Sequence, residues 1–132
     1  MYLLDTNIII FAINNKSDKL LNKINNNSRS GVYVSSLTVA ELEFGVSNSN
    51  KIEQNRIALI KFLSLFNILD FTGKDAIPYG IIKSKLKRIG KLIGPIDMLL
   101  AAQAINNGMV MVTNNTREFM RIDGLTVEDW TK

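Results

Sequence analysis

The chain of 132 residues contains neither cysteine nor histidine. Without cysteine there is no disulfide, no thiolate nucleophile and no cysteine-bound structural zinc. Without histidine there is no Ser-His-Asp triad, no imidazole zinc site and no histidine acid–base pair of the kind that cleaves RNA through its 2′-hydroxyl. Any chemistry must therefore come from carboxylates, hydroxyls, amides, Lys and Arg. The oxygen ligands in this set favour Mg²⁺ or Mn²⁺ over zinc.

Long apolar runs and a basic leader are also missing. No stretch approaches the roughly 18 uninterrupted apolar residues of a membrane span. The first five residues include no basic side chain and end on a carboxylate, Asp5, so we expect no signal peptide, a cytoplasmic protein and no membrane partner. The hydrophobic fraction of 46% and the charged fraction of 21% are those of a globular chain, and the length fits a single domain over residues 1–132.

The net charge of +4 is unevenly spread along the chain. Five cationic side chains and no acidic ones lie within residues 83–91. They are Lys83, Lys85, Lys87, Arg88 and Lys91. Such a concentration can bind the phosphates of a nucleic acid, and we take these five as candidate RNA-binding residues. The same pattern also fits a solvated helix face.

Short apolar runs bounded by turn or capping residues predict five strands. These runs span residues 2–4, 32–35, 66–69, 109–113 and 125–127. Helices are expected between them, at residues 8–13, at 38–44 with Gly45 closing the helix, at 53–65, after the capping-box pattern 72–75, and from Pro95 to Gly108. Residues 22–27 are rich in Asn and are expected to form a loop.

Alternating strands and helices predict an α/β three-layer sandwich with a mostly parallel central sheet flanked by helices. In such sheets the active site lies just beyond the carboxyl ends of the strands. Asp5 directly follows the first strand, although an Asp there can also cap the next helix. Glu41 follows the second strand, but Thr38-Val-Ala-Glu41 also matches a capping box, which would give Glu41 a structural role.

Asp97 stands in the first turn of a helix that is apolar on nearly every side. The helix dipole stabilises a carboxylate there by only about 0.3–1 kcal/mol, which is too little to offset its burial. A bound cation would offset it. Thr113 closes the fourth strand, and Thr113, Asn115 and Glu118 can each supply oxygen to the same site. For Asn114 and Thr116 we favour a turn built on local side-chain-to-backbone bonds.

Four ordered blocks cover nearly the whole chain. They are Leu4-Asp5-Thr6-Asn7, Ser36-Leu-Thr-Val-Ala-Glu41-Leu, Ile93-Gly-Pro-Ile-Asp97 and Val112-Thr113-Asn-Asn-Thr-Arg-Glu-Phe119. Together they resemble the PIN-domain ribonuclease toxins of the VapC family. The ending, Leu125-Thr-Val-Glu-Asp-Trp130, resembles the enteric-type members. Each block alone is weakly specific, whereas the ordered set is specific.

The resemblance implies acidic metal ligands at Asp5, Glu41 and Asp97, and a catalytic-site hydroxyl at Thr113. It also implies Mg²⁺ or Mn²⁺, endoribonuclease activity, a homodimer, and a VapB-type antitoxin through which a larger assembly binds operator DNA. Many PIN domains carry a fourth acid where this chain has Asn115. The candidates for a fourth ligand, or for residues that support the ligands, are Asn115, Glu118, Thr6 and Asn7.

These features predict hydrolysis of an RNA phosphodiester by a metal-activated water, which leaves a 5′-phosphate and a 3′-hydroxyl and needs no imidazole. The resemblance to the enteric-type toxins implies tRNA, and within it the anticodon stem-loop of initiator tRNA. The alternative is a non-catalytic PIN-like module that acts as co-repressor with a DNA-binding antitoxin. A receiver domain is disfavoured because paired acids after the first strand are missing, and a haloacid-dehalogenase-type phosphatase because position 7 is Asn.

Overall fold

The computed structural model describes residues 1–15 and 17–132. Five strands in these residues form one sheet: β1 (Tyr2–Leu4), β2 (Val32–Ser35), β3 (Asn67–Leu69), β4 (Val110–Val112) and β5 (Val127–Glu128). The helices of the described part are α1 (Thr6–Asn15), α2 (Asp18–Asn26), α3 (Ser36–Ser47), α4 (Ile52–Leu63), α5 (Ala76–Arg88), α6 (Pro95–Asn106) and α7 (Thr116–Phe119), with a 3₁₀ turn at Ser28–Ser30.

The sheet has the strand order β3-β2-β1-β4-β5, and each of its four pairings is parallel. Strand β1 is central, with Leu4 in register with Val34 of β2 and with Val112 of β4. The carboxyl ends of β1, β2 and β4 therefore meet at one edge of the sheet, and Asp5 stands in the middle of that edge. The expectation of a mostly parallel α/β sheet is confirmed.

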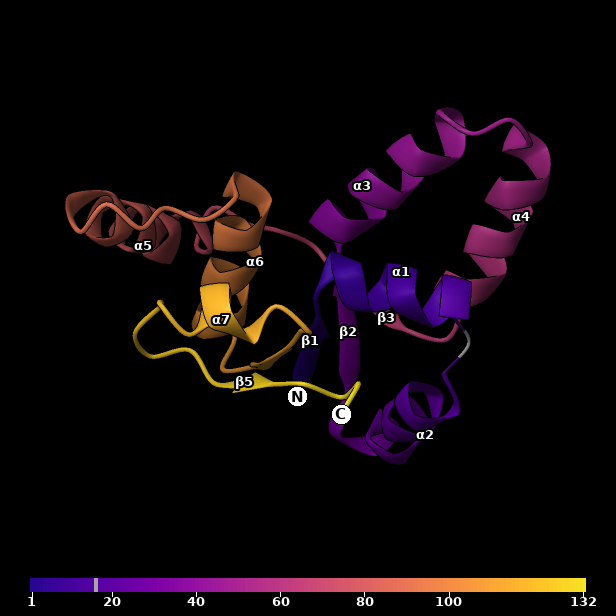
Figure 1. The fold of residues 1–132 in the computed structure, drawn as a ribbon, viewed down its shortest axis with the longest axis horizontal. Helices are drawn as coiled ribbons and strands as arrows, with labels where there is room; N and C mark the ends of the chain where they lie inside the picture. Colours follow the sequence, from indigo (N-terminus) through magenta and orange to yellow (C-terminus); the bar gives the residue numbers. More distant parts are fainter. Residues whose placement is uncertain (16) are drawn as a thin grey trace.

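Side chains alternate between the two faces of the sheet, as the period of a strand requires. Leu3 belongs to the core cluster of α5, α6 and α7, whereas Leu4 belongs to the cluster of α1, α2, α3 and α4. On β4, Met111 and Val112 divide in the same way. Helices thus cover both faces, and the molecule has the three layers that the sequence predicts (Figure 1).

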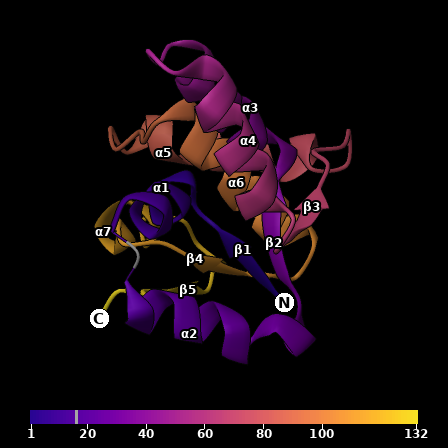
Figure 2. The same cartoon turned by 90° about the vertical axis from the view of Figure 1, so that its right-hand side faces the viewer.

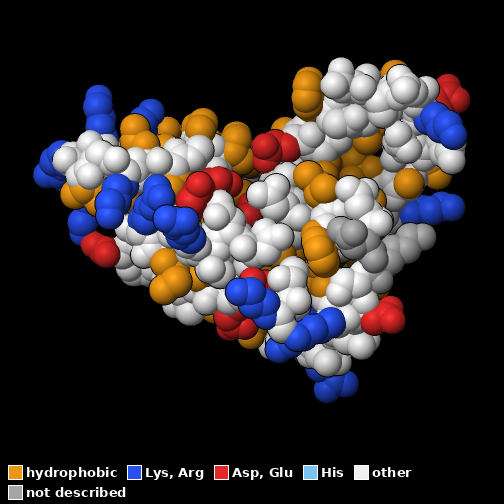
Figure 3. Space-filling model, in the orientation of Figure 1, with side chains coloured by type: hydrophobic (Ala, Val, Ile, Leu, Met, Phe, Trp, Pro, Cys, Tyr) orange, Lys and Arg blue, Asp and Glu red, His pale blue; other side chains and the backbone are white. Residues whose placement is uncertain are grey.

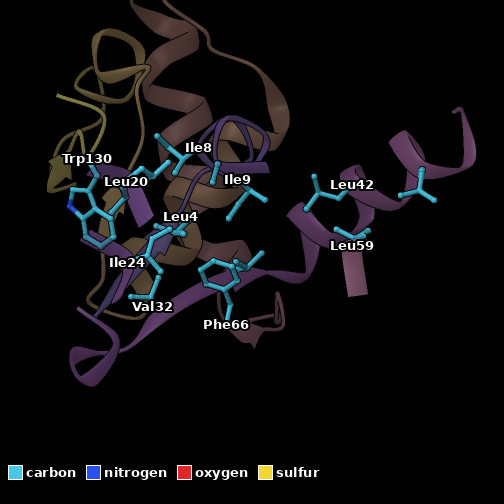
Figure 4. Packing of buried hydrophobic residues seen from close by; sticks show 14 residues of the cluster. Leu4, Ile8, Ile9, Leu20, Ile24, Val32, Leu42, Leu59, Phe66 and Trp130 are labelled. Carbon is cyan, nitrogen blue, oxygen red and sulfur yellow. The ribbon is translucent and has the colours of Figure 1, made fainter. Parts of the chain in front are cut away.

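The expected loop at residues 22–27 is wrong, because most of it belongs to helix α2. Ser17 caps this helix by accepting a hydrogen bond from the Leu20 amide at 3.4 Å. Leu20 and Ile24 are buried beside Trp130 from the end of the chain (Figure 4). The Trp130 ring in turn packs on Tyr2, with the ring centroids 4.9 Å apart. Contacts with the far end of the chain therefore stabilise a helix whose local sequence favours a loop.

Three helix boundaries also differ from expectation. Gly45 lies inside α3, which continues to Ser47, so it is not the residue that closes the helix. The Thr72–Asp75 box forms, with the Asp75 carboxylate accepting the Thr72 amide at 2.8 Å, but α5 begins only after it, at Ala76. Thr116, expected in a turn together with Asn114, is instead the first residue of the short helix α7.

Two helical arms rise from the carboxyl edge of the sheet. Helices α3 and α4 form one arm, and α5 with α6 forms the other (Figure 1). The space-filling view shows a notch between the two arms (Figure 3). A view turned by 90° shows α2 below the sheet, at the end away from α3 and α4 (Figure 2). None of the helices in residues 1–15 and 17–132 has the length and apolar character that a membrane span requires. Helix α1, helix α3 and the first turn of α6 surround the edge of the sheet at which Asp5 lies.

Candidate active site

A pocket of about 690 Å³ lies in the notch, and acidic side chains from three elements line it. Asp5 follows β1, Glu41 lies in the middle of α3, and Asp97 lies in the first turn of α6. Figure 3 shows acidic side chains gathered at the base of the notch between the two arms. The fold therefore brings the three sequence-predicted acids to one place, although 92 positions separate the first from the last.

Asp5 is almost completely buried, at 1% exposure. The Thr113 hydroxyl donates to its Oδ2 at 2.8 Å, while its Oδ1 is buried and has no hydrogen-bond partner among residues 1–15 and 17–132. Burial raises the pKa of this carboxyl, and the charge of Glu41 adds to the increase. The Thr113 hydroxyl and the backbone amides of Thr6 and Asn7 act in the opposite direction. A buried carboxylate oxygen without a partner is costly, and a cation in the pocket would remove that cost.

Asp97 is half-buried and lines the same pocket from α6. Its pKa is raised to about 6, first by burial and then by the negative charges of Asp5, Glu118 and Glu41. A Cβ at Gly94 would lie 3.5 Å from the Asp97 Oδ2, so the glycine leaves open space beside the carboxylate. Crowded carboxylates either hold a proton or recruit a cation, and the raised pKa of Asp97 reflects this crowding.

Glu41 is held by a hydroxyl group rather than by a helix cap. Helix α3 begins at Ser36 with Ser35 as its N-cap, so Thr38 lies inside the helix and the capping-box interpretation is wrong. The Thr6 hydroxyl instead donates to the Glu41 Oε1 at 2.7 Å, and the hydroxyls of Thr6 and Thr38 are 2.9 Å apart. This contact joins α1 to α3 and turns Glu41 towards the pocket.

The residues after β4 support the site without lining the pocket. The Thr113 hydroxyl accepts the Asn115 amide at 2.9 Å as well as donating to Asp5. The Asn115 side chain donates to the Glu118 Oε2 at 3.0 Å. Glu118 is near enough to raise the pKa of Asp97. Of the four candidates for a fourth ligand, only Thr6 and Asn7 are among the residues that line the pocket.

Apart from Glu41, one wall of the pocket is apolar, and the sequence reasoning missed this wall. Leu37, Ala40, Glu41 and Phe44 line the pocket from α3, and Ile10 lines it from α1. The four α3 positions have the spacing of one helical face, which is a signal that the sequence does contain. Phe44 is 70% exposed, so an aromatic ring stands open to solvent at the rim of an acidic pocket.

None of the five candidate RNA-binding residues lines the pocket. Lys83, Lys85, Lys87 and Arg88 lie in α5, Lys91 follows that helix, and all five are exposed. Lys85 forms an ion pair with Asp123, and the Lys83 ammonium lies over the Tyr79 ring, 5.8 Å from its centroid. Figure 3 shows Lys and Arg side chains gathered over the α5 side of the molecule, beside the notch.

The acidic residues fit a hydrated ion better than one enclosed by protein. No group of three acidic side chains in residues 1–15 and 17–132 is arranged so that it could hold a metal ion by itself. Mg²⁺, however, keeps several waters and is often bound by only one or two carboxylates. The partnerless Oδ1 of Asp5, the crowded carboxyl of Asp97 and an all-oxygen donor set fit such an ion.

A second, apolar groove of about 770 Å³ lies between α1, α3 and α4. Its lining includes Leu42, Leu59 and Phe62, and Gly45 leaves it open on the α3 side. The groove shares Ile10 and Glu41 with the acidic pocket, so the two cavities adjoin.

Comparison with known proteins agrees with the fold and the four sequence blocks. The PIN-domain family model matches residues 2–125. "Ribonuclease VapC2" of Rickettsia felis is 41% identical over 133 residues, covering 100% of this chain and 99% of that protein. "tRNA(fMet)-specific endonuclease VapC" of Shigella flexneri is 39% identical and covers 98% of each protein.

Among solved structures, the VapBC2 complex of Rickettsia felis bound to a DNA fragment from its promoter contains a similar chain. It has a TM-score of 0.94 and 41% identity, and the match covers 98% of each chain. Family model, full-length relatives and structure all point the same way: the chain belongs to the PIN-domain family, among its VapC members.

Proposed function

We propose that the chain is an endoribonuclease that depends on Mg²⁺ or Mn²⁺ and acts as the toxin of a toxin–antitoxin pair. The observation that carries the proposal is the Oδ1 of Asp5, which is buried without a hydrogen-bond partner in the described part of the chain, in a pocket also lined by Glu41 and Asp97. Full-length relatives named as ribonucleases support the same activity.

In this proposal Asp5 and Asp97 would hold the ion together with its waters, and the second carboxylate oxygen of Glu41 would accept hydrogen bonds from those waters. When bound, the ion would supply an activated water and stabilise charge on the phosphate. The Thr113 hydroxyl fixes the Asp5 Oδ2 at 2.8 Å, so that Oδ1 is the oxygen left for the ion. The products would carry a 5′-phosphate and a 3′-hydroxyl.

The substrate that we propose is tRNA. The exposed cations of residues 83–91 can hold phosphates next to the notch, and the open ring of Phe44 offers a face on which an unpaired base can stack. The name of the Shigella flexneri relative, a tRNA(fMet)-specific endonuclease, supports initiator tRNA as the specific target.

The partner that we propose is a VapB-type antitoxin, as in the Rickettsia felis complex. The apolar groove between α1, α3 and α4 can take an apolar helix or strand of that partner. Because the groove meets the acidic pocket at Glu41, a basic side chain on the same segment could reach the acids. The exposed Ile52, Ile57 and Ile60 on α4 are further apolar surface for assembly, including the expected homodimer.

The test is cleavage of purified tRNA by the wild-type chain and by Glu41→Gln. We expect cleavage with Mg²⁺ or Mn²⁺, none with EDTA, and a loss of at least about 100-fold in Glu41→Gln, because the variant keeps the shape but loses the charge. Since Glu41 does not cap α3, the variant should melt within about 2 °C of the wild type. Metal-independent cleavage, or no cleavage by the wild type, would contradict the proposal, and the second result would favour a non-catalytic binding module.

A further inference from the structure

The buried hydroxyl of Thr38 is not used by the mechanism proposed above. Thr38 is 0% exposed, and the described residues offer its hydroxyl a partner in Thr6, at 2.9 Å. Thr6 is itself only 8% exposed and contacts Glu41 at 2.7 Å. Three side chains from two helices thus form a continuous line of hydrogen bonds that runs from the interior to the pocket.

The direction of this line follows from counting protons. An ionised carboxylate only accepts hydrogen bonds, so the Thr6 hydroxyl must donate its single proton to the Glu41 Oε1. Thr6 can then only accept from Thr38, and the Thr38 hydroxyl is the donor of the 2.9 Å contact. Each donor polarises the next in such a chain, which strengthens the bond that reaches the carboxylate.

The line holds one of the two carboxylate oxygens of Glu41. Oε1 accepts from Thr6, which fixes the orientation of an exposed side chain. Because both oxygens belong to one carboxylate, fixing Oε1 also fixes the direction of Oε2, which remains available for contacts in the pocket. A valine at position 38 would remove the last donor without changing the shape of the side chain, and the Thr6 hydroxyl could then turn away from Glu41.

We infer that Thr38 is a positioning residue: through Thr6 it orients Glu41 for the ion and the phosphate, without itself touching either. The inference rests on the proposed metal-dependent function. A residue that only joined α1 to α3 would affect metal binding whether or not the Glu41 carboxylate is present. A positioning residue affects metal binding only through that carboxylate.

The test is a double-mutant cycle read by Mn²⁺ affinity, measured calorimetrically on the purified full chain. Thr38→Val should weaken Mn²⁺ binding by about 3- to 10-fold, somewhat less than is usual for a residue in direct contact with a metal ligand. In a Glu41→Gln background the same change should alter the affinity by less than about 2-fold, because its target is gone. Thr38→Ser keeps the hydroxyl and should restore wild-type affinity.

Thr72→Val is the matched control, since its hydroxyl also donates to a carboxylate, that of Asp75 at 3.3 Å, but outside the pocket. It should leave the Mn²⁺ affinity unchanged. Equal losses from Thr38→Val with and without the Glu41 carboxylate, or no loss at all, would overturn the inference. If Thr38→Val fails to fold, Thr38→Ala takes its place in the same cycle. A wild type that binds no Mn²⁺ would overturn the proposed function as well, so the two failures are distinguishable.

Discussion

Asp97 shows at the scale of one residue how a carboxylate can lower the stability of the fold that holds it. Its pKa is raised to about 6, by burial and by three neighbouring negative charges. A raised acid pKa means that the folded state holds its proton more tightly than the unfolded state does. This contribution to stability is therefore fully present below pH 3.8 and is lost as the pH rises through about 6.

Replacing Asp97 with Asn should therefore stabilise the metal-free protein above pH 6, because no charge then has to be buried. We expect a gain of about 1–2 kcal/mol in the free energy of unfolding at pH 7.5, after allowing for solvent around a half-buried side chain. Near pH 3.5 the variant and the wild type should be equally stable. Urea unfolding in EDTA at several pH values measures this difference.

The same variant should lose most of its response to metal. Mg²⁺ stabilises the wild type only in so far as it binds the folded state, and Asp97→Asn removes one of the proposed ligands. Its thermal midpoint should rise much less with Mg²⁺, and tRNA cleavage should fall by orders of magnitude. A purely structural Asp97 predicts the reverse, with lower metal-free stability, an intact Mg²⁺ response and intact cleavage.

At the scale of elements, α3 connects the two cavities of the molecule. Gly45 lies inside this helix and lines the apolar groove, and apart from its chain neighbours and the nearby backbone of α3, no atom of the described residues lies within 4 Å of where its Cβ would be. Gly45→Ala should therefore raise the free energy of unfolding by about 0.5–1 kcal/mol, as expected for glycine in a helix interior. A longer side chain would extend into the groove.

Gly45→Gln should accordingly weaken antitoxin binding by at least about 10-fold while RNA cleavage by the free toxin is retained. Gly45→Ala is the matched control and should bind the antitoxin within about 2-fold of the wild type. Calorimetric titration of each toxin variant with the antitoxin gives the affinities. Unchanged affinity in Gly45→Gln would place the antitoxin elsewhere on the molecule.

The elements also show what the sequence can predict and what it cannot. The buried strands and α6 were predictable because their signals are local: short apolar runs, a proline at the first helical position, and a glycine after the last turn. Helix α2 was not predictable, because only Leu20 and Ile24 of its nine residues are buried. The side chain against which they pack, Trp130, lies far along the chain.

The candidate site divides in the same way. Asp5 and Glu41 could be placed together from the sequence because each follows a strand, and parallel strands end at a common edge. Asp97 follows no strand; its position in an apolar helix indicated a cation, and the resemblance to the VapC family placed it with the other two acids. The line of hydroxyl groups from Thr38 to Glu41 could not be predicted. The local sequence instead matches a capping box, and the contact between Thr38 and Thr6 exists only because α1 packs on α3. Phe44 was missed for a related reason: an apolar side chain is normally assigned to the core, and nothing local shows that this ring is exposed.

At the scale of the whole molecule, charge is separated between the notch and the α5 side. The cations of residues 83–91 lie beside the acidic pocket, so RNA held by them would run past the acids (Figure 3). Lys85 is already paired with Asp123, which leaves the cations near the end of α5 as the better candidates for phosphate contacts. If α5 instead presents only a solvated helix face, neither the number nor the position of these cations should affect RNA cleavage.

A triple variant, Lys87→Gln, Arg88→Gln and Lys91→Gln, separates these interpretations. If all three side chains contact phosphates, the slope of log(1/KM) against log salt should become shallower by about 2, because each contact with a single strand contributes about 0.7. KM for tRNA should rise by at least about 10-fold while kcat stays within about 2-fold, since none of the three lines the pocket.

The matched control removes the same charge from the far end of the molecule, with Lys19→Gln, Lys23→Gln and Arg29→Gln on and after α2 (Figure 2). An equal effect in the control would mean that only net charge matters, and no effect in either variant would return the segment to a solvated face.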